Sequence, residues 1–459
     1  MTTLRPAPAL GALPSDLPAV RREPAVPGGF AVGGTSAGIK ASGRPDLAIV
    51  QVLDGPAAVA GVFTQNAFAA APVRLCRANL AATLPDGRGR FGWTDGVIST
   101  SGSANAATGA DGERDQARVA ELFAAALRTT PERTLGMSTG LIGSRLPLDK
   151  VAAGITALAA TLNADPDALV AAAEALRTTD SRPKLATAEV ELPGAGGHPR
   201  RVRVSGISKG VGMIHPRMAT MLAVLLTDAA AAPETLAAII SPVAARTWNQ
   251  LTVDGDTSTN DTVLLLASGA SGAAPVSLGS DAFETLRRAV EAVARDLARQ
   301  QAADGEGATT LLTCQVSGAL DDAEARAVAR AVVSSSLVKA AAHGRDPNWG
   351  RIAGAAGNAR LADAAVLATS GMGEAEARLR GGSPATLDPA RLRIAIAGHL
   401  VYDGTQGGPV AFDKAAARAS LDAPEILARL DLGLGEGTGE AFGCDLTEEY
   451  VIENSEYST

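Results

Sequence analysis

The chain has 459 residues, of which 46% are hydrophobic and 20% charged, so it can bury a substantial core and is not expected to be disordered as a whole. At about 150 residues per domain, this length corresponds to about three domains or to one large α/β domain. The formal net charge is −8 and aromatic residues make up only 3%, which argues against a dedicated nucleic-acid-binding protein, since such proteins usually carry a basic face.

The chain shows no pattern typical of a secreted or membrane protein. Residues 1–27 are rich in proline and lack a long apolar stretch, which predicts a flexible tail and not a signal peptide. No apolar run approaches the ~20 residues of a membrane-spanning helix. Cys76, Cys314 and Cys444 lie far apart and form no disulfide framework or CxxC motif, and the four histidines show no metal-ligand spacing. We therefore expect a cytoplasmic protein without a metal site.

Patterns typical of strands and helices alternate along the chain. Apolar runs predict buried strands, and alanine-rich or amphipathic runs predict helices, one of them with Ser280 as its N-cap. In chain order these are strands at 46–53 and 59–65, a helix at 113–129, a hairpin tip at 193–200, a strand at 221–226, a helix at 280–304, a strand at 311–316 and a helix at 321–333. The alternation predicts an α/β fold class in which apolar strands are sandwiched between alanine-rich helices.

The segment 208–228, SKGVGMIHPRMATMLAVLLTD, is the stretch whose pattern bears most directly on chemistry. Glycines and a proline make its first half irregular, whereas the apolar run 221–226 predicts a strand buried on both faces. Thr220 lies where the two halves meet. A hydroxyl held there by the strand, next to a strained loop, is placed to attack the Ala219 carbonyl. Hydrolysis of the resulting ester would leave Thr220 as a new N-terminus.

An N-terminal threonine has a base that an internal threonine lacks. Its own α-amine, with a reference pKa of about 7.7–8.0, is partly neutral at pH 7 and accepts the hydroxyl proton directly or through a water. A cation such as Lys209 would lower that pKa further if it were close in space. Composition and spacing alone nevertheless favour an ordinary threonine at a strand edge, so this pattern by itself does not establish a nucleophile.

Sequence blocks along most of the chain bear on this choice. The segment 209–222, KGVGMIHPRMATML, resembles the signature of the ornithine acetyltransferase family, the bifunctional glutamate N-acetyltransferases of arginine biosynthesis, whose members cleave themselves between the Ala and the Thr of this motif. The resemblance extends in order from about residue 28 to residue 459. It includes GIK at 38–40, AGVFT at 60–64, STGLIG at 138–143, TTD at 178–180, LTVDGDTSTND at 251–261, DGEGAT at 304–309, LVK at 337–339, DPNWGR at 346–351 and CDLTEEYVIENSEYST at 444–459.

The resemblance implies a fold, a chain division and an assembly. The family has an α/β (α+β) sandwich of the self-cleaving N-terminal-nucleophile type, which it shares with a group of aminopeptidases. Cleavage between Ala219 and Thr220 would divide the chain into an α chain, 28–219, and a β chain, 220–459. Family members are heterotetramers of two α and two β chains, so the same assembly is implied for this chain.

The resemblance also assigns site residues. Thr220 matches the nucleophile, and the Thr139 hydroxyl with the Gly140 N–H matches the oxyanion hole, whose donors stabilise charge that develops on the substrate carbonyl. The residues that match substrate-binding positions are Thr179, Lys209, Thr220, Glu306, Asn454 and Thr459. This set suits an amino acid, because Lys209 can pair with a carboxylate and Glu306 with an ammonium group.

The implied reaction is acetyl transfer from N2-acetyl-L-ornithine to L-glutamate by a ping-pong mechanism through acetyl-Thr220. Some members also accept acetyl-CoA, so acetyl-CoA stays open as a second donor. No metal or prosthetic group is implied, and neither nucleic acid nor a membrane is an expected partner. Asp254, Asp256 and Asp261 are compatible with a cation site, but their Gly/Thr/Asn-rich setting favours a turn with surface carboxylates.

Five positions differ from the family's usual residues, namely Thr100, Ser103, Ala107, Thr310 and Ala340. None of them matches the nucleophile or the oxyanion hole, but they belong to blocks that shape the site. Three alternatives therefore stay open: a paralogue that acts on another N-acyl amino acid, a self-cleaving amidohydrolase or aminopeptidase of the same fold, and a non-catalytic binding protein that has kept the fold.

Overall fold

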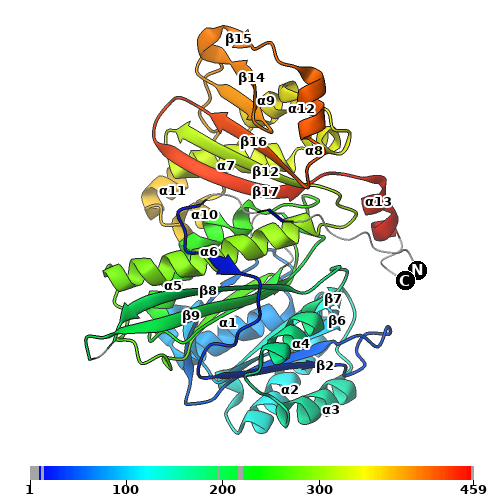
Figure 1. Ribbon diagram of the computed structural model, residues 1–459. Coiled ribbons are helices and arrows are strands. Elements are labelled where there is room, and N and C mark those ends of the chain that lie inside the picture. The colour runs from blue at the N-terminus through cyan, green and yellow to red at the C-terminus, as the bar shows by residue number, and fades with distance from the viewer. Residues whose placement is uncertain (1–9, 12–14, 195, 216–220, 456–459) are drawn as a thin grey trace.

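The chain forms a larger lobe and a smaller lobe, which follow each other in the sequence (Figure 1). The computed structural model describes residues 10–11, 15–194, 196–215 and 221–455. Strands of the larger lobe form a seven-stranded and a four-stranded sheet, and strands of the smaller lobe form a six-stranded sheet. Helices cover or separate these sheets, so the expected mixed α/β fold is confirmed.

The seven-stranded sheet contains the apolar strand that the sequence predicts at 221–226. Strand β10 (Leu222–Thr227) is buried at all six of its residues and lies between β9 (Pro199–Lys209), which is antiparallel to it, and β11 (Thr262–Ala267), which is parallel. A strand with neighbours on both edges and layers on both faces requires such an uninterrupted apolar run. The strand order is β1 (Val20–Arg21), β8 (Lys184–Pro193), β9 (Pro199–Lys209), β10 (Leu222–Thr227), β11 (Thr262–Ala267), β4 (Ala57–Phe63) and β5 (Phe91–Thr94).

The larger lobe is a layered sandwich. Helices α5 (Pro233–Arg246) and α6 (Asp281–Ala303) pack on one face of the seven-stranded sheet, and the predicted N-cap is present, because Ser280 Oγ accepts the Phe283 N–H at 3.1 Å. A second core, which includes α1 (Ala71–Thr83) and α4 (Pro166–Leu176), separates this sheet from the four-stranded sheet. Helices α2 (Gly109–Leu127) and α3 (Leu148–Ala159) form the outer layer. The four-stranded sheet has the order β2 (Phe30–Thr35), β3 (Leu47–Val52), β6 (Gly96–Ser103) and β7 (Thr134–Leu141).

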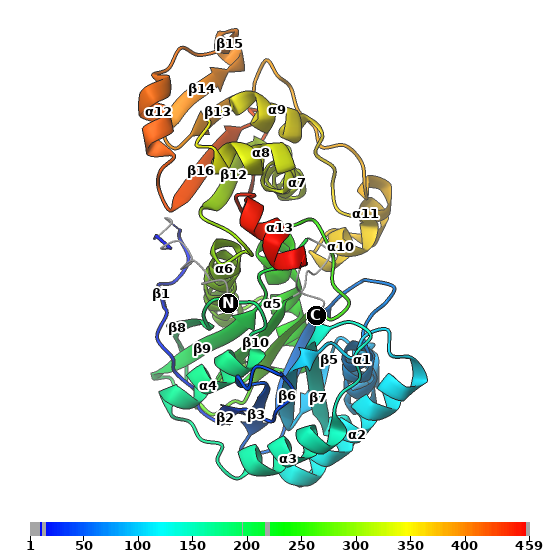
Figure 2. The ribbon, with the colours of Figure 1, turned by 90° about the vertical axis from the view of Figure 1, so that its right-hand side faces the viewer.

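The smaller lobe has its own core, formed by the six-stranded sheet and the helices that cover it. The sheet has the order β15 (Gly408–Pro409), β14 (His399–Asp403), β13 (Arg393–Ile396), β16 (Glu425–Asp431), β12 (Leu311–Ala319) and β17 (Gly437–Cys444). The helices are α7 (Asp322–Ser334), α8 (Ser336–His343), α9 (Trp349–Gly357), α10 (Ala364–Thr369), α11 (Glu374–Arg380) and α12 (Lys414–Ser420). The chain then returns to the junction between the lobes, where α13 (Glu448–Ser455) lies (Figure 2).

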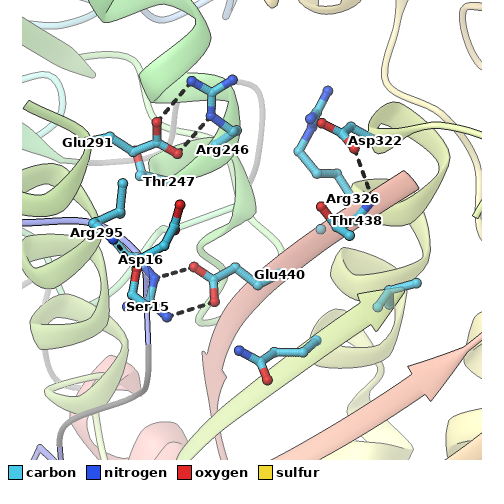
Figure 3. Close-up of a pocket in the computed structure, with 14 residues that line it drawn as sticks. Ser15, Asp16, Arg246, Thr247, Glu291, Arg295, Asp322, Arg326, Thr438 and Glu440 are labelled. Atoms are coloured by element: carbon cyan, nitrogen blue, oxygen red, sulfur yellow. Dashed lines mark hydrogen bonds and ion pairs between the residues drawn. The ribbon is translucent and has the colours of Figure 1, made fainter. Parts of the chain in front are cut away.

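Paired charges line a cavity of about 350 Å³ where the two lobes meet. Figure 3 shows Arg295 of α6 facing Glu440 of β17, with an Arg295 Nη2–Glu440 Oε2 distance of 2.9 Å. Arg246 and Glu291 form a second pair, which joins α5 to α6 at 2.8 Å. The Arg295–Glu440 pair joins the two lobes, and its two-point contact restricts orientation as well as distance, whereas the Arg246–Glu291 pair lies within the larger lobe.

Part of the segment expected to be a flexible tail is docked on the larger lobe. Strand β1 pairs with β8 and extends the seven-stranded sheet by one strand. Next to it, Arg22 forms an ion pair with Asp296 of α6 at 2.8 Å. The prediction for residues 1–27 is therefore wrong at these positions, because a proline-rich segment can still pair as an edge strand.

The predicted division into α and β chains falls inside a sheet and not between the lobes. Strands β9 and β4 precede the junction in sequence, whereas β10 and β11 follow it, and the four strands are neighbours in the seven-stranded sheet. Ala219 and Thr220 themselves lie outside the described residues. Among the described residues, no helix is long and apolar enough to cross a membrane.

Candidate active site

The described residues that the sequence predicts for the site line one pocket. The pocket has a volume of about 300 Å³ and is lined by residues of β7, the end of β9, several loops and α13. Its lining includes the predicted residues Thr139, Gly140, Thr179, Lys209, Glu306 and Asn454. Thr220 and Thr459 are also predicted for the site, but they lie outside the described residues. Segments separated by more than 300 positions in the sequence therefore meet at one cavity.

Lys209 provides the cation of the pocket. It is the last residue of β9 and is buried, and its Nζ donates to Thr178 Oγ1 at 2.8 Å and to Thr139 Oγ1 at 3.2 Å. Burial lowers the pKa of Lys209 below its ordinary value, although Asp180 and Glu306 act in the opposite direction. Because the ammonium donates to Thr139, the Thr139 hydroxyl keeps its own hydrogen for another acceptor. This is the arrangement that an oxyanion-hole hydroxyl needs.

A buried network of ion pairs lies next to Lys209 and contacts the backbone that follows it. Asp180 Oδ1 accepts the Gly210 N–H at 2.8 Å and Lys184 Nζ at 2.7 Å, and Lys184 also contacts Asp304 Oδ2 at 2.6 Å. Burial alone would raise the pKa of Asp180, but Lys184 and Lys209 outweigh burial and hold it well below its usual range. Asp180 therefore stays ionised and fixes the backbone at the point where β9 ends.

Glu306 provides the carboxylate of the pocket. Its Oε1 accepts the Thr179 hydroxyl at 2.8 Å and its Oε2 accepts Asn454 Nδ2 at 2.9 Å. A Cβ atom at Gly212 would lie 2.1 Å from Glu306 Oε2, so only glycine at position 212 leaves room for this orientation. Three residues predicted separately for substrate binding thus form one hydrogen-bonded group, to which α13 contributes Asn454.

Gly140 and Asn260 determine the backbone around Thr139. Gly140 has φ +129°, and a Cβ there would lie 2.4 Å from the carbonyl carbon of Gly102 on the neighbouring β6, so a larger residue would separate the strands. Asn260 is buried, and its Nδ2 donates to the Ala104 carbonyl at 2.6 Å and to the Ser138 carbonyl at 2.8 Å. These bonds hold the ends of β6 and β7 together beside Thr139.

Met221 is the first described residue after the predicted junction, and two contacts fix its peptide groups. Its N–H donates to Asp261 Oδ1 at 3.1 Å, and its carbonyl accepts the Thr262 N–H at 3.1 Å. Leu222, the next residue, is the register partner of Lys209. The chain therefore enters β10 directly beside the cation of the pocket.

Known proteins resemble this chain along most of its length. The ArgJ family model matches residues 31–459. The chain belongs to the ArgJ family. It is 44% identical over 434 residues to the "Arginine biosynthesis bifunctional protein ArgJ" of Thermus thermophilus, and the match covers 95% of this chain and 99% of the relative. It is 43% identical over 432 residues to the protein of the same name from Thermosynechococcus vestitus, and that match covers 94% of this chain and 96% of the relative.

A solved structure is also similar to this chain. It is described as ornithine acetyltransferase complexed with ornithine from Mycobacterium tuberculosis, and it is 38% identical, with a TM-score of 0.38, covering 43% of this chain and 97% of that chain. The family model and the curated relatives confirm the expected family and the expected enzyme of arginine biosynthesis.

The five departures from the usual ArgJ family residues lie outside the pocket lining. Thr100 Oγ1 lies 2.9 Å from Ser138 Oγ, and Ser103 Oγ donates to the Ser144 carbonyl at 2.7 Å, so both support the strands behind Thr139. Thr310 is buried, and its hydroxyl has no hydrogen-bond partner among the described residues. The other two departures, Ala107 and Ala340, are exposed. None of the five positions therefore contributes to the described lining of the pocket.

Several contributing residues were not identified as site residues from the sequence. They are Thr178, Asp180, Asn260 and Asp261, which hold or flank the pocket residues. Thr178 and Asp180 adjoin Thr179, and Asn260 and Asp261 end the TSTND segment, so their only signal was their place in blocks typical of the ArgJ family. Asp254 accepts the N–H groups of Met213 and Ile214, and Asp261 accepts that of Met221. Asp261 is completely buried, so the expectation of a surface carboxylate is wrong at this position.

Proposed function

We propose that this chain is an autoprocessed N-acetyltransferase that moves an acetyl group from N2-acetyl-L-ornithine to L-glutamate through an ester on Thr220. The observation that supports the substrate class is the pairing of one ammonium, on Lys209, with one carboxylate, on Glu306, in a single pocket. An acylated diamino acid carries the complementary carboxylate and ammonium. We assign Lys209 to the substrate carboxylate and Glu306 to the side-chain ammonium, with Thr179 and Asn454 orienting Glu306.

In the proposed activation step, Thr220 Oγ attacks the Ala219 carbonyl carbon. The Ala219–Thr220 peptide bond breaks, and the hydroxyl proton passes to the departing nitrogen. Water then hydrolyses the ester, which leaves a carboxylate on Ala219 and a free amine and hydroxyl on Thr220. That amine is the base for the later steps.

In the transfer steps, Thr220 Oγ attacks the acetyl carbonyl of the donor and the α-amine of Thr220 takes the hydroxyl proton. Charge on the carbonyl oxygen is stabilised by the Thr139 hydroxyl and the Gly140 N–H, each of which is worth about 10²–10³ in rate in comparable sites. The proton then passes to the leaving ornithine amine. Glutamate attacks the acetyl ester in the second half-reaction and restores Thr220. The same ester gives acetyl-CoA a route into the cycle as an alternative donor.

The sheet order supports tight association of the α chain, 28–219, with the β chain, 220–459. Six residue pairs join β9 to β10 and six join β4 to β11, so the two chains would share the centre of one sheet. Cleavage would therefore leave the fold intact. Assembly of two such pairs into a heterotetramer, and a cytoplasmic location, are part of the same proposal; one ArgJ relative, from Ostreococcus lucimarinus, is named as chloroplastic.

The test combines mass measurement with an acetyl-transfer assay. Wild-type protein should give two masses, one for a chain that ends at Ala219 and one for a chain that begins with Thr220. Thr220→Ala should give one unbroken mass and no transfer, whereas Thr220→Ser keeps a hydroxyl and should retain part of both activities. Full activity of Thr220→Ala would refute the proposal.

The same assay distinguishes the hydrolase alternative. With N2-acetyl-L-ornithine alone, a transferase should release little ornithine beyond one equivalent per site, and glutamate should start turnover with formation of N-acetyl-glutamate. A hydrolase would release ornithine and acetate continuously, at a rate that glutamate does not change.

A further inference from the structure

Arg326 brings an unpaired guanidinium group to the cavity between the lobes. The cavity has a volume of about 350 Å³, and its lining includes Arg246, Arg295 and Arg326. Arg246 Nε lies 2.8 Å from Glu291 Oε1, and Arg295 Nη2 lies 2.9 Å from Glu440 Oε2. Among the residues that the structure describes, the Arg326 guanidinium forms no ion pair and no hydrogen bond (Figure 3). One positive charge on the cavity wall therefore has no contacting anion.

Asp322 lies one helical turn before Arg326 on α7 and also lines the cavity, but the two side chains are not paired. An acidic residue followed four positions later by arginine is a spacing that favours an ion pair on a helix. Glu376 and Arg380 form such a pair on α11, at 2.9 Å. Asp322 Oδ1 instead accepts the Thr438 N–H of β17 at 2.9 Å. Helix α7 therefore presents a carboxylate and a guanidinium side by side without the bond that would join them.

The surroundings of Arg326 do not compensate its charge by contact. Burial lowers the pKa of Arg326, Asp322 acts in the opposite direction, and Arg246 of the larger lobe adds to the lowering. Arginine nevertheless stays protonated in proteins, so the partly buried group remains a cation. Withdrawing a charge from water without a contacting counter-ion is unfavourable. A bound carboxylate would supply that counter-ion, because its two oxygens match the planar fork of a guanidinium.

We propose that the cavity between the lobes is a binding site for a free α-amino acid, whose carboxylate is held by Arg326 and whose ammonium is held by Asp322. Residues four apart on a helix are neighbours, about 5–6 Å apart at Cβ, so their side chains suit opposite charges carried on one carbon atom. The cavity volume lies at the lower end of the usual range for small-molecule sites, about 300–1,000 Å³, as a ligand of this size requires. The site shares no lining residue with the pocket of Lys209 and Glu306, and it is independent of the proposed cleavage and acetyl transfer.

L-Valine and two of its analogues test the two contacts. L-Valine carries both charges, 3-methylbutanoate lacks the ammonium, and 2-methylpropylamine lacks the carboxylate. In calorimetric titrations of the full chain, L-valine should bind at one site at least about 10-fold more tightly than either analogue. The valine side chain has no cation for Glu306, so L-valine is a poor ligand for the active-site pocket.

Three variants locate the binding. Arg326→Gln removes the guanidinium, and Asp322→Asn removes the negative charge but keeps an oxygen that can accept the Thr438 N–H. Each should weaken L-valine binding by about 10–100-fold. The matched control Arg118→Gln removes an exposed arginine from α2 and should bind L-valine as wild type does. Without ligand, Arg326→Gln should melt at or above the wild-type temperature, because no carboxylate loses its partner.

Four results would overturn the proposal. They are no detectable binding of L-valine to wild type, equal binding by Arg326→Gln and wild type, equal binding by Asp322→Asn and wild type, and a loss in Arg118→Gln as large as the loss in Arg326→Gln. Equal affinity of wild type for L-valine and 3-methylbutanoate would refute the contact between Asp322 and the ammonium, since it would leave a site for simple anions. None of these measurements depends on acetyl transfer, so the proposed function stands or fails separately.

Discussion

Gly212→Ala should move the Glu306 carboxylate without disturbing the fold. The added Cβ would lie 2.1 Å from Glu306 Oε2 and 2.4 Å from its Cδ. An ordinary contact between carbon atoms is about 3.5 Å or more, so the carboxylate must retreat by about 1 Å. The atoms in the way belong to the end of a flexible side chain, and Gly212 is not among the glycines with a positive φ, so the backbone accepts alanine.

The magnitude follows from the contacts that Glu306 loses. At 2.8 Å from Thr179 Oγ1 and 2.9 Å from Asn454 Nδ2, the carboxylate cannot move by about 1 Å and keep both bonds. A hydrogen bond to a charged group is worth about 1.5–3 kcal/mol, so kcat/KM for N2-acetyl-L-ornithine should fall by about 10–100-fold, mainly through KM. The free energy of unfolding should change by less than about 1 kcal/mol.

Steady-state kinetics with varied donor and acceptor, together with thermal unfolding, test this expectation. Glutamate has no side-chain ammonium, so its KM should change less than that of the donor. Gly354→Ala is a matched control, because a Cβ at Gly354 in α9 meets nothing within 4 Å. An unchanged donor KM in Gly212→Ala, or equal effects on donor and acceptor, would refute the assignment of Glu306 to the donor ammonium.

Three further results are expected. Lys184→Met removes the cation that pairs with the buried Asp180 and Asp304, and it should lower the free energy of unfolding measured in urea by about 3–5 kcal/mol. The pKa of Asp180 is held well below its usual range, so this loss should persist at neutral pH and shrink only as the pH falls below about 4. Because burial lowers the pKa of Lys209, affinity for the donor should begin to decline at a pH below 10.5, the ordinary pKa of lysine. A decline that begins only above pH 10.5 would contradict this. Cleaved protein should elute as one species in native gel filtration although it gives two bands under denaturing conditions, and separation of the chains without denaturant would contradict the shared sheet.

The sequence correctly predicted those strands, helix ends and turns that a local residue pattern is enough to specify. The apolar run before Asp228 is β10, Ser280 caps α6, and the stretch after Pro193 is the tip of the β8–β9 hairpin, where Pro193 pairs with Pro199. In these cases periodicity, capping and turn chemistry act within a few residues of each other. The tail was predicted less well, because pairing of β1 with β8 depends on an open sheet edge that no local pattern reveals.

The sequence by itself determined which residue types are available for acyl transfer and, through the ArgJ family motif, which positions they occupy. Only the tertiary structure decided that Lys209 donates to Thr139, that Glu306 joins Thr179 to Asn454, and that Asp261 holds Met221. The physical reason is that each of these contacts joins segments from 40 to 148 positions apart, and their distances depend on how strands and helices pack. Spacing along the chain encodes a motif, whereas the balance of charge and hydrogen bonds in the pocket exists only after the sheets have assembled.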